Sequence, residues 1–467
     1  MSKLSNAPAG PVDGGGVQEA EAFCRRHPEI RHVDAIFIDM SGVARGKRLP
    51  VSELAGLYTQ GMNLPASLYL LDVTGDQLDV LGRGFSDGDP DATGFPIAGT
   101  LAPAPWLKAG SGPGLGQVLM QLYEPDTREI CYDPRNILAA VVARFADLGL
   151  TPVVACELEF YLIDAVRGEQ GAPQPPRLSG SGRRDVNNQV YGLEELDYYQ
   201  DFLTDLQKWS AMQNVPASMA SAEFGPGQFE INLQHRADAL RAADDAALLR
   251  RLVRAAAQAR GLEASFMSKP YSDKAGSGFH VHVSVVDAAG QNIFAGNGAA
   301  GSAELRHAIG GLRAAMAQSM AIFAPNLGAF RRFGPNIFVP LSTCWGYNNR
   351  SAAIRVPPGP DAGRRIEHRV AGAEANPYLL VAAILAGMHH GLVSKADPGP
   401  PVAGNAAAQL APDLPHNFWA ALEAMSAGTI LPGYFPGNYT ALYVDAKRRE
   451  LEKFMQTISP QEYDWYL

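Results

Sequence analysis

The chain has 467 residues, of which 46% are hydrophobic and 19% charged, as in a folded globular protein large enough for about two to four domains. The 39 Lys and Arg residues and 48 Asp and Glu residues give a formal net charge of −9. This acidic balance argues against nucleic acid and anionic membranes as general partners, because both bind a basic surface.

The cysteine pattern argues against a disulfide framework or a cysteine-rich zinc site. The chain has four scattered cysteines and no Cys-x-x-Cys pair: Cys24, Cys131, Cys156 and Cys344. Residues 1–16 contain no apolar stretch typical of a signal peptide. The longest strongly apolar run, Tyr378 to Met388, is too short to span a bilayer and indicates a buried helix. We expect a soluble, cytoplasmic protein without membrane partners.

The N-terminal part is predicted to be a small domain. Residues 1–16 are rich in Gly, Pro and Ala and predict a disordered arm. From about Arg31 the pattern predicts two short strands joined at Ser41-Gly42, followed by a helix. Residues 82–116 are dense in Gly, Pro and Asp and predict mainly loop. We place this first domain at residues 17–130.

Near residue 130 the sequence changes from a loop-rich stretch to regular helix and strand patterns. Asp133 and Pro134 are typical of a helix start, and the helix leads into the buried strand TPVVACELEFYLI. Beyond a Pro-rich insertion, strands are expected at 228–233 and 279–286. Long helices are expected at 238–260, 302–323 and 376–390, capped by Asp238, Ser302 and Asn376. Without steady βα alternation, this pattern favours an α+β fold over a doubly wound sheet, with a second domain at 131–467.

Acidic and imidazole side chains recur on the predicted strands. Glu157 and Glu159 are two apart on one strand and therefore share a face. Taken alone, this pair would also be explained by a strand with one face exposed to solvent. Three further segments carry glutamate or histidine on or beside a predicted strand: Glu223-Phe-Gly-Pro-Gly-Gln-Phe-Glu230, Gly276-Ser-Gly-Phe-His280-Val-His282-Val-Ser284 and Arg365-Ile-Glu367-His-Arg369.

Together these segments offer five glutamates and a histidine, which are expensive to bury without a cation. Oxygen ligands with one imidazole suit Mg²⁺ or Mn²⁺ better than structural zinc. Two or three such ions commonly handle nucleotide phosphates.

Seven arginines lie among aromatic, Gly and Pro residues, as phosphate or carboxylate binders do, although a solvated basic surface is the alternative. They are Arg331, Arg332, Arg350, Arg355, Arg364, Arg365 and Arg369. The segment Gly42–Arg48 lacks the spacing and the Ser or Thr of a phosphate loop. No GxGxxG follows a strand, and no Gly-x-Ser-x-Gly is present.

The order of these segments along the chain resembles that of the glutamine synthetase family. The resemblance includes Asn-Arg-Ser-Ala-Ala-Ile-Arg at 349–355 and covers roughly residues 30–467. LPASLYLLDVTGD, Pro-Ile-Ala-Gly-Thr-Leu and the ending EYDWYL resemble its γ-glutamylpolyamine (γ-glutamylputrescine) synthetase branch. The resemblance implies a small N-terminal β-grasp domain and a large catalytic domain with a curved antiparallel sheet flanked by helices. It also implies a homo-oligomer, usually a dodecamer of two hexameric rings with active sites between subunits.

The resemblance further implies roles for matching positions. One metal would be held by Glu159, Glu223 and Glu230, and a second by Glu157, His280 and Glu367. Glutamate would contact Gly276, Arg332 and Arg369. ATP would contact His282, Ser284, Arg350 and Arg355, with Arg350 also near the transferred phosphoryl group.

The chain departs from the family where the amine binds. Phe338 occupies the position of a flap glutamate that helps bind ammonium in glutamine synthetases. The segment Met62–Ser67 contains no acid where a neighbouring subunit would lend an aspartate, and Ala275 replaces an asparagine. An apolar pocket at Phe338 suits the methylenes of an alkylamine better than an ammonium ion.

We therefore expect ATP-dependent ligation of the glutamate γ-carboxylate to a primary amine, a polyamine such as putrescine, through a γ-glutamyl phosphate. Alternatives are a ligase for a monoamine such as ethanolamine, a true glutamine synthetase and an inactive structural or regulatory homologue. Glu230 is a candidate for the base that takes the amine proton, provided that metal does not occupy it fully. Glu194, Glu195 and Asp197 are candidates for holding the distal ammonium of a diamine.

Overall fold

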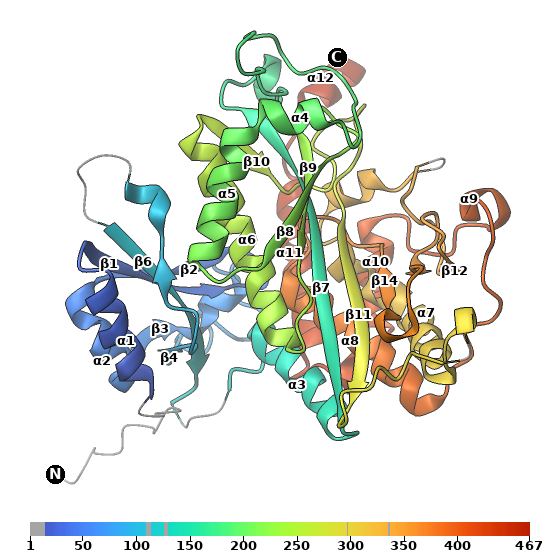
Figure 1. Cartoon of the computed structure of the whole chain (residues 1–467), viewed down its shortest axis with the longest axis horizontal. Coiled ribbons are helices and arrows are strands. Elements are labelled where there is room, and N and C mark those ends of the chain that lie inside the picture. The colour runs from blue at the N-terminus through green and yellow to red at the C-terminus, as the bar shows by residue number, and fades with distance from the viewer. Residues whose placement is uncertain (1–14, 109–113, 126–128, 297, 335–336) are drawn as a thin grey trace.

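A six-stranded sheet forms the N-terminal part of the chain in the computed structural model, which describes residues 15–108, 114–125, 129–296, 298–334 and 337–467 (Figure 1). Its strand order is β2-β1-β6-β4-β3, with β5 paired to β6. Only the β1–β6 pair is parallel among these described strands. The strands are β1 (Ile30–Ile38), β2 (Ala44–Pro50), β3 (Met62–Pro65), β4 (Asp91–Pro96), β5 (Ala102–Pro103) and β6 (Gly114–Tyr123).

Two helices accompany this sheet, α1 (Gly15–Arg26) and α2 (Leu54–Gln60). The predicted strand pair around Ser41-Gly42 is confirmed as β1 and β2, with α2 following after one 3₁₀ turn. Helix α1 begins at Gly15, inside the segment expected to be a disordered arm, and residues 1–14 lie outside the described residues. The domain limits at 17–130 and 131–467 stay predictions.

An eight-stranded sheet forms the centre of the second part of the chain (Figure 1). Its order is β12-β13-β14-β11-β7-β9-β8, with β10 paired to β7, and among these strands only β12 and β13 are parallel. The strands are β7 (Leu150–Asp164), β8 (Ala217–Ala222), β9 (Gln228–Leu233), β10 (Leu262–Ser265), β11 (Phe279–Asp287), β12 (Trp345–Tyr347), β13 (Ile354–Val356) and β14 (Ile366–His368). The predicted strands at 228–233 and 279–286 are confirmed.

Long helices cover one face of this sheet because every second strand residue there is apolar and buried, such as Cys156, Leu158 and Val281. The predicted caps are confirmed at Asp133, Asp238, Ser302 and Asn376, whose side chains accept from backbone N–H groups in the first turn. The capped helices are α3 (Pro134–Ala146), α6 (Ala239–Ala259), α7 (Ala303–Phe323) and α8 (Pro377–Ser394).

Helix α8 lies in the core against α7, as its apolar sequence predicts. Within the described part of the chain, α8 is the one helix long and apolar enough to cross a membrane. Because 78% of its apolar window is buried inside the protein, the helix is better explained as a core element.

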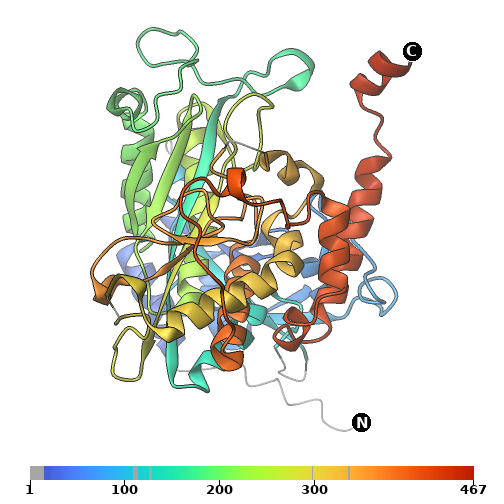
Figure 2. The ribbon, with the colours of Figure 1, turned by 90° about the vertical axis from the view of Figure 1, so that its right-hand side faces the viewer.

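The remaining helices lie at the edges of the second sheet or follow it in sequence. They are α4 (Leu193–Tyr198), α5 (Gln200–Met212), α9 (Ala406–Gln409), α10 (Phe418–Ser426), α11 (Tyr439–Met455) and α12 (Pro460–Tyr466). Helix α11 joins the two parts of the chain, because Lys453 Nζ lies 2.7 Å from Asp72 Oδ2 and Lys447 Nζ lies 3.2 Å from Ser41 Oγ. Figure 2 shows α12 standing away from the rest of the ribbon at the C-terminal end.

Candidate active site

The predicted polar residues lie on the face of the eight-stranded sheet opposite the helices. Strand register sets His280 opposite Glu157 and Glu159 opposite Glu230. On the other side of β11, His282 lies opposite Glu367. Side chains alternate along each strand, so these directly paired positions share one face. Five neighbouring strands, from β13 to β9, thus contribute to a single site.

His280 lies at the centre of one group of ligand atoms. Its Nδ1 is 3.5 Å from Glu157 Oε2 and 3.9 Å from Glu230 Oε2, and its Nε2 is 3.9 Å from Glu159 Oε1. One ligand atom each from Glu157, Glu230 and His280 lies within 4.8 Å of the others. This group contains members of both metal sites that the family resemblance implies.

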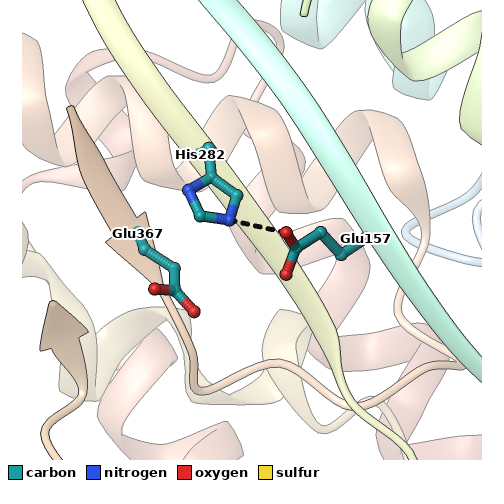
Figure 3. A group of neighbouring side chains, drawn as sticks. All are labelled: Glu157, His282 and Glu367. Atoms are coloured by element: carbon teal, nitrogen blue, oxygen red, sulfur yellow. Dashed lines mark ion pairs between the residues drawn. The ribbon is translucent and has the colours of Figure 1, made fainter. Parts of the chain in front are cut away.

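His282 belongs to a second group of ligand atoms, with Glu157 and Glu367 (Figure 3). Its Nε2 lies 2.9 Å from Glu157 Oε1. Arg365 Nε donates to Nδ1 of the same ring at 3.1 Å, and since arginine cannot accept, neutral His282 carries its proton on Nε2. The family resemblance assigns His282 to ATP, and in the structure its ring lies beside Glu157 and Glu367.

The buried carboxylates repel one another. Burial raises the pKa of Glu223 to about 8, and the negative charge of Glu159 adds to the shift. Burial also raises the pKa of Glu230 to about 9, together with the charges of Glu157, Glu159 and Glu223. Burial acts the same way on Glu157, but hydrogen bonds from His280 and His282 outweigh it and hold its pKa far below the usual range.

This donor set fits divalent cations. Carboxylate oxygens with an imidazole are the ligands expected for Mg²⁺ or Mn²⁺. In Glu223 and Glu230 the protein environment disfavours the ionised form, and a nearby cation would reverse that preference. Glu159 is already oriented, because its Oε2 accepts from the Gly278 backbone N–H at 2.8 Å.

Two arginines hold Glu367 in its charged form. Arg355 Nη1 donates to Glu367 Oε2 at 2.7 Å, and Arg369 Nη1 donates to the other carboxylate oxygen. Burial raises the pKa of Glu367, but the charge of Arg369, with those of the neighbouring histidines and Arg355, brings it to about 2. Both arginines are therefore fixed beside the carboxylate group, as a site for anionic substrates requires.

Arg332 lies beneath Gly276, two positions that the resemblance assigns to glutamate. Its side chain is buried and donates through Nη1 to the Val370 carbonyl at 2.8 Å. A Cβ at position 276 would lie 2.7 Å from Arg332 Cγ and 2.7 Å from the Ser268 carbonyl oxygen. Only glycine lets the backbone approach this arginine so closely.

The other residues assigned to ATP lie around the same face. Ser284 follows His282 on β11 and is partly buried. Arg350 is exposed in the segment between β12 and β13, near enough to Glu223 for its positive charge to lower that residue's pKa. The structure thus brings Arg350 toward the carboxylates, although it lies about 130 positions from Glu223 in sequence.

Phe338 is 57% exposed, and its ring centroid lies 6.5 Å from that of Phe224, which is 46% exposed. The sequence did not single out Phe224, although its position directly after Glu223 was a signal. Nor did it single out Gln228, whose Nε2 donates to the Gly276 carbonyl at 3.1 Å. The candidate acids Glu194, Glu195 and Asp197 lie on α4, which packs beside β8.

Comparison with known proteins agrees with this geometry. The family model for the glutamine synthetase catalytic domain matches residues 131–466. The chain belongs to the glutamine synthetase family. The α+β fold and the family resemblance are confirmed, and the chain is a ligase that forms a carbon–nitrogen bond between glutamate and an amine.

Three relatives illustrate the match. Gamma-glutamylputrescine synthetase PuuA of Escherichia coli (strain K12) is 38% identical over 450 residues, which cover 96% of this chain and 94% of the relative. Glutamate–isopropylamine ligase of a Pseudomonas species is 28% identical over 451 residues, covering 94% of this chain and 96% of that protein. A solved GmaS–ADP complex superposes with a TM-score of 0.81 at 27% identity, covering 95% and 98% of the two chains.

Proposed function

We propose that the chain is an ATP-dependent ligase that joins the γ-carboxylate of glutamate to a primary amine, and that its substrate is a polyamine such as putrescine. The observation that carries the proposal is Phe338, an exposed aromatic side chain near the turn that bears Glu223, where an ammonium-binding glutamate would be expected. The 38% identity to a γ-glutamylputrescine synthetase supports the same choice of amine.

The proposed reaction has two steps. An oxygen of the glutamate γ-carboxylate attacks the γ-phosphorus of ATP, ADP leaves, and γ-glutamyl phosphate forms. The amine nitrogen then attacks the γ-carbonyl carbon, phosphate leaves, and the nitrogen loses a proton. In this scheme Gly276, Arg332 and Arg369 hold glutamate, while Arg350 and Arg355 hold phosphate oxygens.

Bound at this site, two or three divalent ions would supply charge neutralisation during phosphoryl transfer. The residues that would hold them are Glu157, Glu159, Glu223, Glu230, His280 and Glu367. All of these side chains except Glu223, which lies in the turn after β8, project from adjacent strands, so the sheet itself keeps their spacing fixed.

The amine must lose a proton before it attacks, because an alkylammonium has a pKa of about 10. Glu230 is the proposed acceptor when one of its oxygens stays free of metal. In the metal-free site the pKa of Glu230 is raised to about 9; bound cations would favour its ionised form, which is the form that can accept the proton.

Phosphate release with ATP, glutamate and Mg²⁺ tests the proposal across ammonium, ethanolamine, isopropylamine, putrescine, cadaverine and spermidine. We expect the highest kcat/KM with a diamine or polyamine and little turnover with ammonium. Ammonium as the best substrate would show that the chain is an ordinary glutamine synthetase. Failure with every amine, in metal-replete protein, would instead favour an inactive homologue.

A monoamine ligase is the second candidate, supported by the likeness to a glutamate–isopropylamine ligase. It predicts that isopropylamine or ethanolamine is turned over better than any diamine in the same panel. The two candidates therefore separate in one experiment.

The family resemblance also supports a homo-oligomer of two hexameric rings, with sites between subunits. The acid-free segment Met62–Ser67 of one copy would then face the amine site of its neighbour. Light scattering should give a mass near twelve times the chain mass of 49.9 kDa. A monomer that is fully active would contradict this assembly.

A further inference from the structure

Two aromatic rings stand side by side at the rim of the site. Phe224 comes from the turn between β8 and β9, and Phe338 comes from the segment before β12. Their ring centroids are 6.5 Å apart with planes inclined by 41°, and the side chains are 46% and 57% exposed. Two large apolar side chains from separate loops thus form a common exposed surface beside Glu223.

The turn that carries Phe224 is held rigidly. The backbone N–H groups of Glu223 and Gly225 donate to the carbonyl and side-chain oxygens of Gln228, each at 2.9 Å. Gln228 Nε2 donates in turn to the Gly276 carbonyl at 3.1 Å, which ties the turn to the glutamate side of the site. A Cβ at Gly225 would collide with the Tyr161 ring, so the backbone packs directly on the strand below. Phe224 is therefore presented in a defined position.

We infer that Phe224 is a specificity-determining residue, and that it and Phe338 bind the alkyl chain of the amine substrate. The inference rests on the proposed function and deepens it by naming the class of amine, a primary amine with a chain of several methylene groups. The rings bury methylenes, and their faces attract an alkylammonium group. Ammonium itself has no chain to bury and gains little from either ring.

The location supports this assignment. Phe224 follows Glu223 directly, and Glu223 lies near enough to Glu159 and Arg350 to feel both charges. In this arrangement an amine chain lies along the rings with its nitrogen end toward Glu223.

Steady-state kinetics of Phe224→Ala and Phe224→Leu test the inference in the full-length, metal-replete protein. With putrescine and butylamine, we expect kcat/KM of Phe224→Ala to fall about tenfold or more, because an aromatic side chain stops covering the methylenes. With ammonium the change should stay within about threefold, and Phe224→Leu should recover much of the loss. The KM values for glutamate and ATP should stay near those of the wild type.

Phe454→Ala is the matched control, because Phe454 is the same kind of side chain, is 56% exposed on α11, and lies outside the residues assigned to the site. It should leave every amine unchanged. Equal losses for ammonium, butylamine and putrescine in Phe224→Ala would overturn the inference and assign the ring a structural role. A change in oligomeric state on gel filtration would overturn it too, by showing that the ring packs against another copy of the chain.

The inference and the proposed function fail in different ways. If wild-type protein turns over ammonium better than any alkylamine, the proposed function is wrong and no alkyl-chain site is needed. If wild-type protein prefers alkylamines but Phe224→Ala keeps that preference, only the role of Phe224 is wrong.

Discussion

Binding of Mg²⁺ to the metal-free protein should release protons. In that form burial and mutual repulsion raise the pKa of Glu223 to about 8 and that of Glu230 to about 9. At pH 7.5 a carboxyl group with the first pKa is about three-quarters protonated, and one with the second is almost fully protonated. Because a metal ligand must be ionised, saturation with Mg²⁺ should displace between about one and two protons per chain.

Isothermal titration calorimetry in two buffers measures this number. Titrations in Tris and in HEPES at pH 7.5 should give apparent enthalpies that differ by the proton count times the difference in buffer ionisation enthalpy. At pH 9, where Glu223 is mostly ionised and Glu230 about half ionised, the release should fall below about one proton.

Two variants serve as controls for the proton count. Glu223→Gln and Glu230→Gln each remove one titrating group and should each lower the release at pH 7.5 by about one proton. Identical enthalpies in the two buffers, with binding clearly detected, would refute the reasoning, because both carboxyl groups would then already be ionised in the metal-free site.

Three further outcomes follow from particular contacts. Gly276→Ala should raise KM for glutamate about tenfold or more in steady-state assays with a smaller effect on ATP, because the new Cβ would lie 2.7 Å from Arg332 Cγ. Asn376→Ala should lower the free energy of unfolding by about 2 kcal/mol in urea denaturation, because its side chain caps α8 and donates to the Asp39 carbonyl at 2.8 Å. Metal-free protein should lose thermal stability as pH rises from about 5 to 9, because the folded-state pKa of Glu230 lies above its unfolded value. The stability that the protonated carboxyl group contributes is lost once Glu230 ionises. Scanning fluorimetry should show that Mg²⁺ reduces this loss.

Much of the second sheet could be predicted because its local signals agree with its final environment. Strand β7 alternates residues that are buried under the helices with Glu157 and Glu159 on the other face. Helices α6, α7 and α8 begin at residues whose side chains cap them. The N-terminal helix α1 could not be predicted, because its first residues are glycines in a stretch with the composition of an arm.

Site residues that pair through strand register were easier to anticipate than those that meet through loops. His280 and Glu157 share a face by strand alternation, and register brings them opposite each other. Phe224 and Phe338 are far apart in sequence and lie in irregular segments, where no periodicity indicates which way a side chain points. The contact of His282 with Glu157 likewise depends on rotamers and on the Arg365 hydrogen bond, which the motif alone does not specify.

The proposed metal ligands and the two aromatic rings lie on different kinds of element, and this has a consequence for redesign. Most of the residues proposed to hold the metal ions project from hydrogen-bonded strands, where a backbone shift would disturb every neighbour. The two rings project from connecting segments that can be exchanged one at a time. Laboratory evolution confined to the segments around positions 224 and 338 should therefore yield ligases for branched, aromatic or hydroxylated amines while the activation of glutamate continues unchanged.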